Sequence, residues 1–241
     1  MAGIAALAVA YVLSQFYRSF LAVLTPALST DLGMTKADLS MASGIWFAVF
    51  ALAQFAVGVS LDRVGPRMTA SVMLGVFGGA GAFLFTVAMT PWMVIAAMAL
   101  IGLGCAPVLM AMLFIFARTY SAARFAVLAS WTIAFGTAGN VIGAAPMAAA
   151  VEMVGWRNAM AVLGLVTVFV AVMIALAARD PARPATREGQ RTGLSGYVDL
   201  LRMRVLWPII PLAAINAAPM NGIRGLWAGP YLEDVYGLDA L

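Results

Sequence analysis

Seven long apolar stretches constrain this chain more than any other feature of its sequence. They cover roughly residues 4–29, 38–61, 67–89, 92–117, 122–151, 158–178 and 205–232. A helix needs about 20 mostly apolar residues to cross a hydrocarbon layer of roughly 30 Å, and it satisfies its own backbone hydrogen bonds there. With 64% hydrophobic and 10% charged residues, the chain has too few polar side chains to cover an aqueous surface. The sequence therefore predicts an all-α membrane protein with seven spanning helices.

The distribution of charge predicts the orientation of these helices. If the amino terminus is cytoplasmic, the inner loops hold ten arginines, whereas the outer loops hold only Lys36 and Arg157 as basic residues. Basic residues gather on the cytoplasmic side of membrane proteins, so we expect a cytoplasmic amino terminus in a bacterial inner (cell) membrane, in contact with membrane lipid. The net charge of +4 is then a topology signal, and we expect no nucleic-acid partner.

A short charged motif occurs twice, ninety positions apart. The first copy reads SLDRVGPRM and begins at Ser60, and the second reads AVEMVGWRN and begins at Ala150. The residue classes that recur at equal spacing are Asp62, Gly65 and Arg67 in the first copy and Glu152, Gly155 and Arg157 in the second. Ninety residues cover three helices, and an odd number of crossings inverts the second copy. This indicates inverted 3+3 repeats, the building units of secondary transporters, with chance similarity of two short turns as the alternative.

The chain divides into three predicted parts. Residues 1–178 form an N-terminal six-helix bundle, 179–204 a basic cytoplasmic linker with an amphipathic helix, and 205–241 a seventh helix that starts a truncated second bundle. The last part repeats the first helix, because PALSTDLG at Pro26 and PYLEDVYG at Pro230 share Pro, Leu and Gly at equal spacing.

The loop GVSLDRVGPR resembles the signature loop between helices 2 and 3 of the major facilitator superfamily. The matching positions are Gly58, Asp62, Arg63, Gly65 and Arg67, whereas Pro66 stands where a basic residue is usual. The resemblance implies a twelve-helix fold of two bundles around a central cavity, which works by alternating access. On this interpretation the chain holds one major-facilitator-type six-helix bundle and the first helix of another. Either a longer protein or other membrane subunits would complete the pathway.

The same resemblance predicts a cytoplasmic latch. Asp62 can accept from backbone N–H groups at a helix N-terminus and can pair with an arginine, for which Arg118 at the end of the fourth helix is the candidate. The alternative is a turn whose charges only orient the helices. The latch residues are Gly58, Asp62, Arg63, Gly65, Arg67 and Arg118.

Two arginines lie within apolar spans, Arg18 in the first and Arg224 in the seventh. An arginine near the bilayer centre costs at least about 2.5 kcal/mol, so its default interpretation is a functional site that faces the bundle interior. Helical spacing places Tyr11 and Gln15 beside Arg18, and Asn221 beside Arg224. Because guanidinium groups bind carboxylate and phosphate bidentately, we expect a small anionic substrate between the two arginines. Structural hydrogen bonds to carbonyls are the alternative.

This arrangement resembles the organic phosphate:phosphate antiporters, which carry one arginine on helix 1 and another on helix 7. The run FGTAGNVIGAAP in the fifth helix is similar to nitrate/nitrite porters and adds Asn140, although close packing of its small residues is the alternative. The predicted substrate-binding residues are Arg18, Arg224, Tyr11, Gln15, Asn140 and Asn221.

Other functions find little support in the composition. There is no histidine and one cysteine, so we expect no metal site, and no cofactor motif or nucleophile–base pair indicates an enzyme. The sequence predicts a secondary active or facilitative transporter of a small organic anion. A transport-incompetent half-bundle that serves as a structural or assembly subunit of a larger membrane complex is the alternative.

Overall fold

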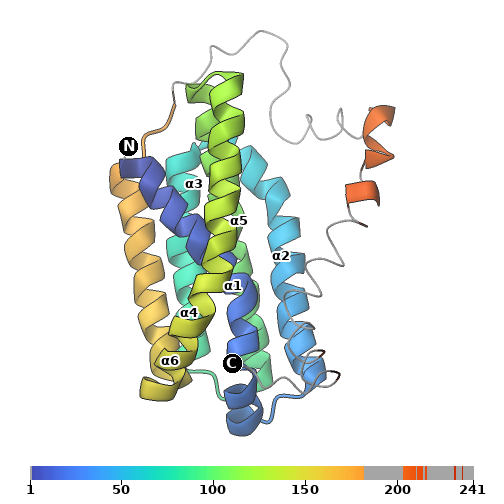
Figure 1. Ribbon diagram of the computed structural model, residues 1–241, viewed down its shortest axis with the longest axis vertical. Helices are drawn as coiled ribbons and strands as arrows, with labels where there is room; N and C mark the ends of the chain where they lie inside the picture. Colours follow the sequence, from blue (N-terminus) through green and yellow to red (C-terminus); the bar gives the residue numbers. More distant parts are fainter. Residues whose placement is uncertain are drawn as a thin grey trace. The chain divides into compact units, whose positions relative to one another are not determined.

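The computed structural model describes residues 2–181, 203–209, 211–213, 215, 231 and 235. Its contacts divide the chain into a unit Met1–Arg183, which holds the helices of the bundle, and a unit Pro184–Leu241. Its helices pack side by side as a bundle (Figure 1) and no strand occurs among the described residues. The elements are α1 (Ala2–Leu32), α2 (Lys36–Arg63), α3 (Pro66–Val72), the π-helix η1 (Met73–Gly78), α4 (Gly79–Thr86), α5 (Pro91–Thr119) and α6 (Ala122–Ala177); the 3-10 helix η2 (Arg204–Leu206) lies in the second unit.

Local sequence signals explain where the helices begin. Thr35 caps α2 in a reciprocal box, in which its side chain accepts from the Asp38 backbone and Asp38 accepts from the Thr35 backbone. Prolines begin α3 and α5, since proline at the first helical position gives up only an N–H group that would lack a partner there. The elements α3, η1 and α4 follow one another without a gap, so they form the single span predicted over 67–89.

The predicted all-α membrane fold is confirmed. Five segments of the described residues are long and apolar enough to cross a membrane: Ala2–Leu32, Lys36–Arg63, Pro66–Thr86, Pro91–Thr119 and Ala145–Ala177. The predicted spans 122–151 and 158–178 are the two arms of α6, which meet at the non-helical residue Gly155. Most of the seventh predicted helix and most of the predicted linker lie outside the described residues.

The two copies of the charged motif have the same backbone geometry. Gly65 has φ 106° and ψ 157°, and Gly155, ninety positions later, has φ 79° and ψ 155°. The arginine two residues after each glycine contacts the end of the third helix of the other repeat, through different groups: the Arg67 backbone N–H donates to the Asp180 side chain beyond α6, and the Arg157 side chain donates to the Ala88 carbonyl beyond α4. The similar turns and the matching positions of these contacts support the inverted repeat against chance similarity.

Small residues allow the helices of the bundle to approach closely. A Cβ atom on Gly104 of α5 would collide with the backbone of Gly78 in η1. In the first arm of α6, a Cβ atom on Gly139 would lie 2.6 Å from Val12 of α1, and one on Gly136 would overlap the Tyr11 ring. The glycines of the fifth predicted helix therefore serve close packing, which was the alternative to a binding role.

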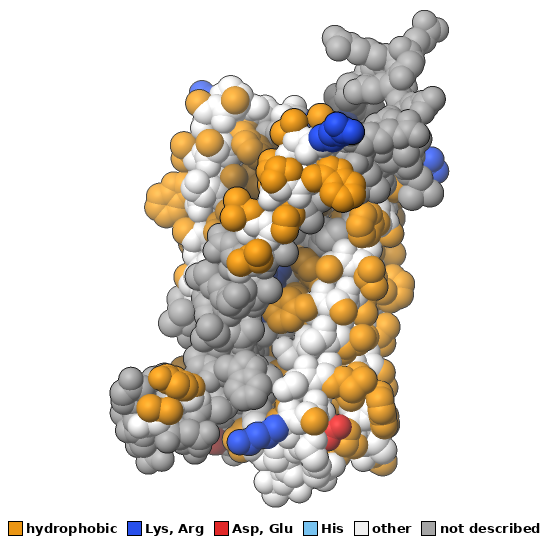
Figure 2. Space-filling model, turned by 90° about the vertical axis from the view of Figure 1, so that its right-hand side faces the viewer, with side chains coloured by type: hydrophobic (Ala, Val, Ile, Leu, Met, Phe, Trp, Pro, Cys, Tyr) orange, Lys and Arg blue, Asp and Glu red, His pale blue; other side chains and the backbone are white. Residues whose placement is uncertain are grey.

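The outer surface of the bundle is apolar along its length. Exposed large hydrophobic side chains include Leu52 and Phe55 on α2 and Phe135, Leu165 and Phe169 on α6. On the face drawn in Figure 2, hydrophobic side chains extend along the helices, and most of the coloured charged side chains lie near the two ends. This distribution suits helices surrounded by lipid, with their charged ends in the polar headgroup layers.

Candidate functional site

Arg18 lies against two aromatic rings of the neighbouring helix. Its guanidinium carbon is 5.3 Å from the centre of the Trp46 ring and 5.0 Å from that of Phe50, both on α2. The Arg18 side chain is half-buried, and its Nε atom is buried without a hydrogen-bond partner in the described part of the chain. A desolvated cation over an aromatic face gains about 2 kcal/mol, which offsets much of the cost of an arginine at this depth. The rings therefore stabilise Arg18 and leave its Nε–H group unpaired within the described part of the chain.

Tyr11 and Gln15 lie on the same helix as Arg18, as the spacing predicts. The Gln15 side-chain nitrogen donates to the Tyr11 hydroxyl at 3.0 Å, and both side chains are buried. The other oxygen of this pair, Gln15 Oε1, has no partner among the described residues. The first helix thus carries an ordered polar group next to the cation.

The remaining predicted substrate ligands cannot be placed beside this group. Arg224 and Asn221 lie outside the described residues, and the Asn140 side chain does too, although its backbone belongs to α6. The facing arrangement of Arg18 and Arg224 therefore stays a prediction.

The predicted partner of Asp62 is correct. Arg118 Nη2 at the end of α5 lies 3.7 Å from Asp62 Oδ1 at the end of α2, and the two side chains are 30% and 46% exposed. The Arg118 guanidinium also lies over the Phe114 ring at 4.2 Å. An ion pair this exposed contributes at most about 1 kcal/mol, so it can form and break at little cost.

A different residue occupies the N-terminus of α3. The Arg67 backbone N–H donates to Asp180 Oδ1 at 2.8 Å, so the acceptor there is Asp180 rather than Asp62. Asp180 approaches because Gly65 has no side chain: a Cβ atom there would lie 3.0 Å from the Asp180 carboxyl carbon. Asp62, Gly65, Arg118 and Asp180 line one small cleft. The other two predicted latch residues are in α2, with Gly58 half-buried and Arg63 in the last turn.

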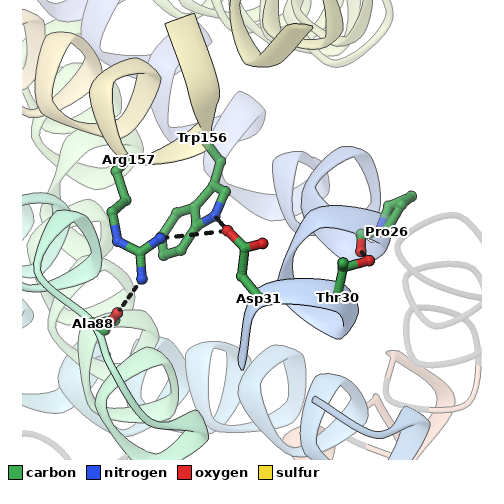
Figure 3. Close-up of polar contacts among 6 residues, drawn as sticks. All are labelled: Pro26, Thr30, Asp31, Ala88, Trp156 and Arg157. Atoms are coloured by element: carbon green, nitrogen blue, oxygen red, sulfur yellow. Dashed lines mark hydrogen bonds and ion pairs between the residues drawn. The ribbon is translucent and has the colours of Figure 1, made fainter. Parts of the chain in front are cut away.

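A second polar cluster lies at the opposite end of the helices (Figure 3). The Trp156 indole N–H donates to Asp31 Oδ2 at 2.7 Å, and Arg157 Nη1 lies 3.4 Å from the same oxygen. Arg157 Nη2 donates to the Ala88 carbonyl at 3.0 Å, and its guanidinium lies 4.1 Å above the Trp156 ring. The cluster connects the end of α1, the chain after α4 and the second arm of α6.

Comparison with protein families decides what this architecture is. The family model described as Major Facilitator Superfamily matches residues 7–241. The chain belongs to the Major Facilitator Superfamily. Comparison with curated proteins gives no match.

This major facilitator protein is accordingly an integral membrane transporter. In the described part of the chain, no group of three or more histidine, cysteine, aspartate or glutamate side chains forms a possible metal site.

Sequence reasoning missed several residues that contribute to these sites. The rings of Trp46 and Phe50 looked like ordinary apolar residues of a spanning helix, and Asp31 looked like a charge in an outer loop. The repeat offered one usable signal for the second site, because Trp156 and Arg157 stand at the same turn as Pro66 and Arg67.

The cluster at the end of α1 yields a stability prediction. Asp31→Ala is expected to lower the free energy of unfolding by about 2 kcal/mol, because it leaves the buried Trp156 indole without its acceptor. Thermal unfolding in detergent measures the change. Glu152→Ala is the control, since it removes an exposed acidic residue from the same region; it should change stability by less than about 0.5 kcal/mol. Equal unfolding temperatures for the two variants would contradict the structural role of the cluster.

Proposed function

We propose that this major facilitator transporter carries a small organic anion by alternating access, with Arg18 as an anion ligand. One observation supports the proposal above others: the Arg18 guanidinium is held by the Trp46 and Phe50 rings, and its buried Nε–H group has no partner among the residues that the structure describes. A guanidinium group presents two parallel N–H donors to carboxylate or phosphate. Since Trp46 and Phe50 stabilise Arg18 through their rings, an incoming anion can accept from the Nε–H group without displacing a partner from the described part of the chain.

Alternating access gains support from the contacts at the ends of the helices. The Asp62–Arg118 pair is half-exposed and long, whereas the Asp31 cluster at the other end combines a short indole bond with two arginine contacts. A weak contact is suited to breaking in each transport cycle, and a stronger cluster to keeping helices of one bundle together. The distribution of arginines supports a cytoplasmic amino terminus in a bacterial inner (cell) membrane.

Anion flux through reconstituted protein tests the proposal. The full-length protein is placed in proteoliposomes, and uptake of radiolabelled glycerate, propionate, glycerol phosphate and propyl phosphate is measured against empty liposomes. We expect uptake of at least one of these anions. Arg18→Ala should weaken its apparent affinity about 10- to 100-fold, the value of a lost charged hydrogen bond. The apparent affinity of Arg18→Lys should lie between those of the wild type and Arg18→Ala, because an ammonium group keeps the positive charge but loses the two parallel N–H donors of the guanidinium group.

A matched substitution separates a local role from a general charge effect. Lys36→Ala removes a basic residue from the first turn of α2, and uptake by this variant should equal that of the wild type. Unchanged uptake by Arg18→Ala, or uptake of none of the four anions by the wild type, would contradict the proposal.

A further inference from the structure

Among the residues that the structure describes, unpaired buried polar atoms are concentrated on two helices. Five buried side-chain nitrogen or oxygen atoms lack a hydrogen-bond partner in the described part of the chain: Gln15 Oε1, Arg18 Nε, Trp46 Nε1, Gln54 Oε1 and Arg67 Nε. The first four belong to α1 and α2. Folded proteins leave few such atoms, because each costs the desolvation of a polar group. Four on two neighbouring helices indicate a site that a ligand completes.

The four side chains lie on facing stripes of the two helices. Gln15 precedes Arg18 by three residues, so it lies on the same face of α1, about 4.5 Å away along the axis. On α2, Trp46, Phe50 and Gln54 follow one another at intervals of four residues and share a face. The Arg18 guanidinium joins the stripes through its contacts with Trp46 and Phe50. Arg18 and Phe50 are half-exposed, so the patch reaches the surface of the bundle there.

The existing hydrogen bonds determine which atoms of the two amides are open. Gln15 donates its nitrogen to the Tyr11 hydroxyl at 3.0 Å, and Gln54 donates its nitrogen to the Ala106 carbonyl at 3.2 Å. Each amide therefore presents an oxygen, which accepts. Arg18 Nε and Trp46 Nε1 can only donate. The patch thus offers two donors and two acceptors to a ligand.

This combination selects the chemistry of the ligand. A bare anion such as nitrate satisfies the two donors, but it leaves both amide oxygens unpaired and faces their negative dipoles. A hydroxyl group satisfies an amide oxygen because it donates. An ammonium group would donate as well, but the positive charge of Arg18 disfavours it.

We propose that the substrate is a hydroxylated organic anion, a carboxylate or a phosphate ester, whose hydroxyl groups donate to Gln15 and Gln54 while its acid group accepts from Arg18 and Trp46. Gln15 and Gln54 are then the residues that determine specificity. The inference rests on the proposed function, since it names the substrate class of the same site. A site that pairs with a hydroxyl group rejects the analogue without it, because its own polar atoms stay unsatisfied.

Matched pairs of ligands test the inference on the purified full-length protein. Glycerate is compared with propionate, and glycerol phosphate with propyl phosphate, so that each pair has three carbons and differs in hydroxyl groups. Dissociation constants come from the rise in unfolding temperature with ligand concentration. We expect the hydroxylated member of at least one pair to bind at least about tenfold more tightly. The pair that shows this preference identifies the acid group as carboxylate or phosphate.

Two variants assign the preference to residues. Gln15→Met and Gln54→Met keep the length of the side chain and remove its acceptor. Each variant should lower the ratio of the affinity for the hydroxylated ligand to the affinity for its analogue at least about threefold. The affinity for the analogue itself should change little. If one variant fails to fold, the other carries the test. Thr137→Val is the control, because this hydroxyl lies on α6 and donates to the Ile133 carbonyl of its own helix, so the ratio should not change.

The results separate this inference from the proposed function. If Arg18→Ala loses anion binding but the two members of each pair bind the wild type equally, the anion site stands and the hydroxyl specificity is wrong. If the preference survives in both glutamine variants, the acceptors lie elsewhere and the assignment is wrong. If Arg18→Ala binds anions as the wild type does, the proposed function fails and the inference fails with it.

Discussion

Gly104→Ala is expected to lower the free energy of unfolding by about 3 kcal/mol, at the upper end of the cost of overpacking. The new Cβ atom would collide with the Gly78 backbone nitrogen and lie 2.6 Å from the Gly78 Cα atom and 3.0 Å from the Met73 carbonyl oxygen. All three atoms belong to the backbone of η1, so no side chain can move aside. The helices must separate instead, which loosens buried contacts of α5 along the interface. Thermal unfolding in detergent should show a decrease of roughly 10 °C.

Gly44→Ala is the matched control for this change. Gly44 also lies within a spanning helix, α2, but a Cβ atom there would meet nothing within 4 Å. The substitution should leave stability unchanged or raise it by up to about 1 kcal/mol, because alanine has the higher helix propensity. If Gly104→Ala is as stable as Gly44→Ala, the close contact between α5 and η1 does not exist as described.

Gly65→Ala is expected to lower the free energy of unfolding by about 3 kcal/mol, for two separate reasons. At φ 106° and ψ 157° the backbone occupies a region that is almost restricted to glycine, and strain of this kind costs about 1–3 kcal/mol. The added Cβ atom would also lie 3.0 Å from the Asp180 carboxyl group, which accepts from the Arg67 N–H. Unfolding temperatures of the variant and the wild type measure the sum of the two effects.

The inverted repeat supplies a control that separates strain from contact. Gly155 has a similar backbone conformation, with φ 79° and ψ 155°, but a Cβ atom there would meet nothing within 4 Å. Gly155→Ala should therefore lower the free energy of unfolding only through backbone strain, by about 2 kcal/mol. In a double-mutant cycle, the loss caused by Gly65→Ala should be smaller when Asp180 is already alanine. Equal losses in both backgrounds would show that Asp180 does not contribute.

The membrane spans and the repeat were within reach of sequence reasoning. Five of the predicted spans agree with helices found among the described residues, and Gly155 marks the break between the two arms of α6. Both successes have a local cause. Hydrocarbon requires about 20 apolar residues in one run, and a backbone at positive φ requires glycine at that position.

The partners of the polar groups were mostly out of reach. The pair Asp62–Arg118 was predicted from residue types at two helix ends, and the structure confirms it. By contrast, Arg67 and Asp180 are 113 residues apart in the chain, and Asp31 and Trp156 are 125 residues apart. No local sequence pattern relates the two residues of either pair. Their contacts depend on where the end of one helix lies relative to a helix that is distant in the chain.

The cluster around Arg18 contains both residues that the sequence predicted and residues that only the structure placed there. Helical spacing placed Tyr11, Gln15 and Arg18 on one face of α1, and the structure agrees. The contributions of Trp46 and Gln54 did not follow from spacing, since α2 is apolar around most of its circumference and its sequence does not tell which face turns inward. The rotation of α2 is decided by its packing against α5, where the Trp46 backbone approaches Gly102.

For this protein, the sequence alone determined the apolar membrane spans of the described bundle, the repeat that relates them and the presence of an arginine within the first span. Each of these depends on one segment at a time, because the segment must match the hydrocarbon layer in length and polarity or must allow its own backbone conformation. The tertiary structure decided what Arg18 touches, which carboxylate occupies the start of α3 and which amide oxygens remain unpaired. Such contacts depend on the rotation and closeness of neighbouring helices, and in a membrane these follow from the fit of side chains against glycines rather than from hydrophobic periodicity.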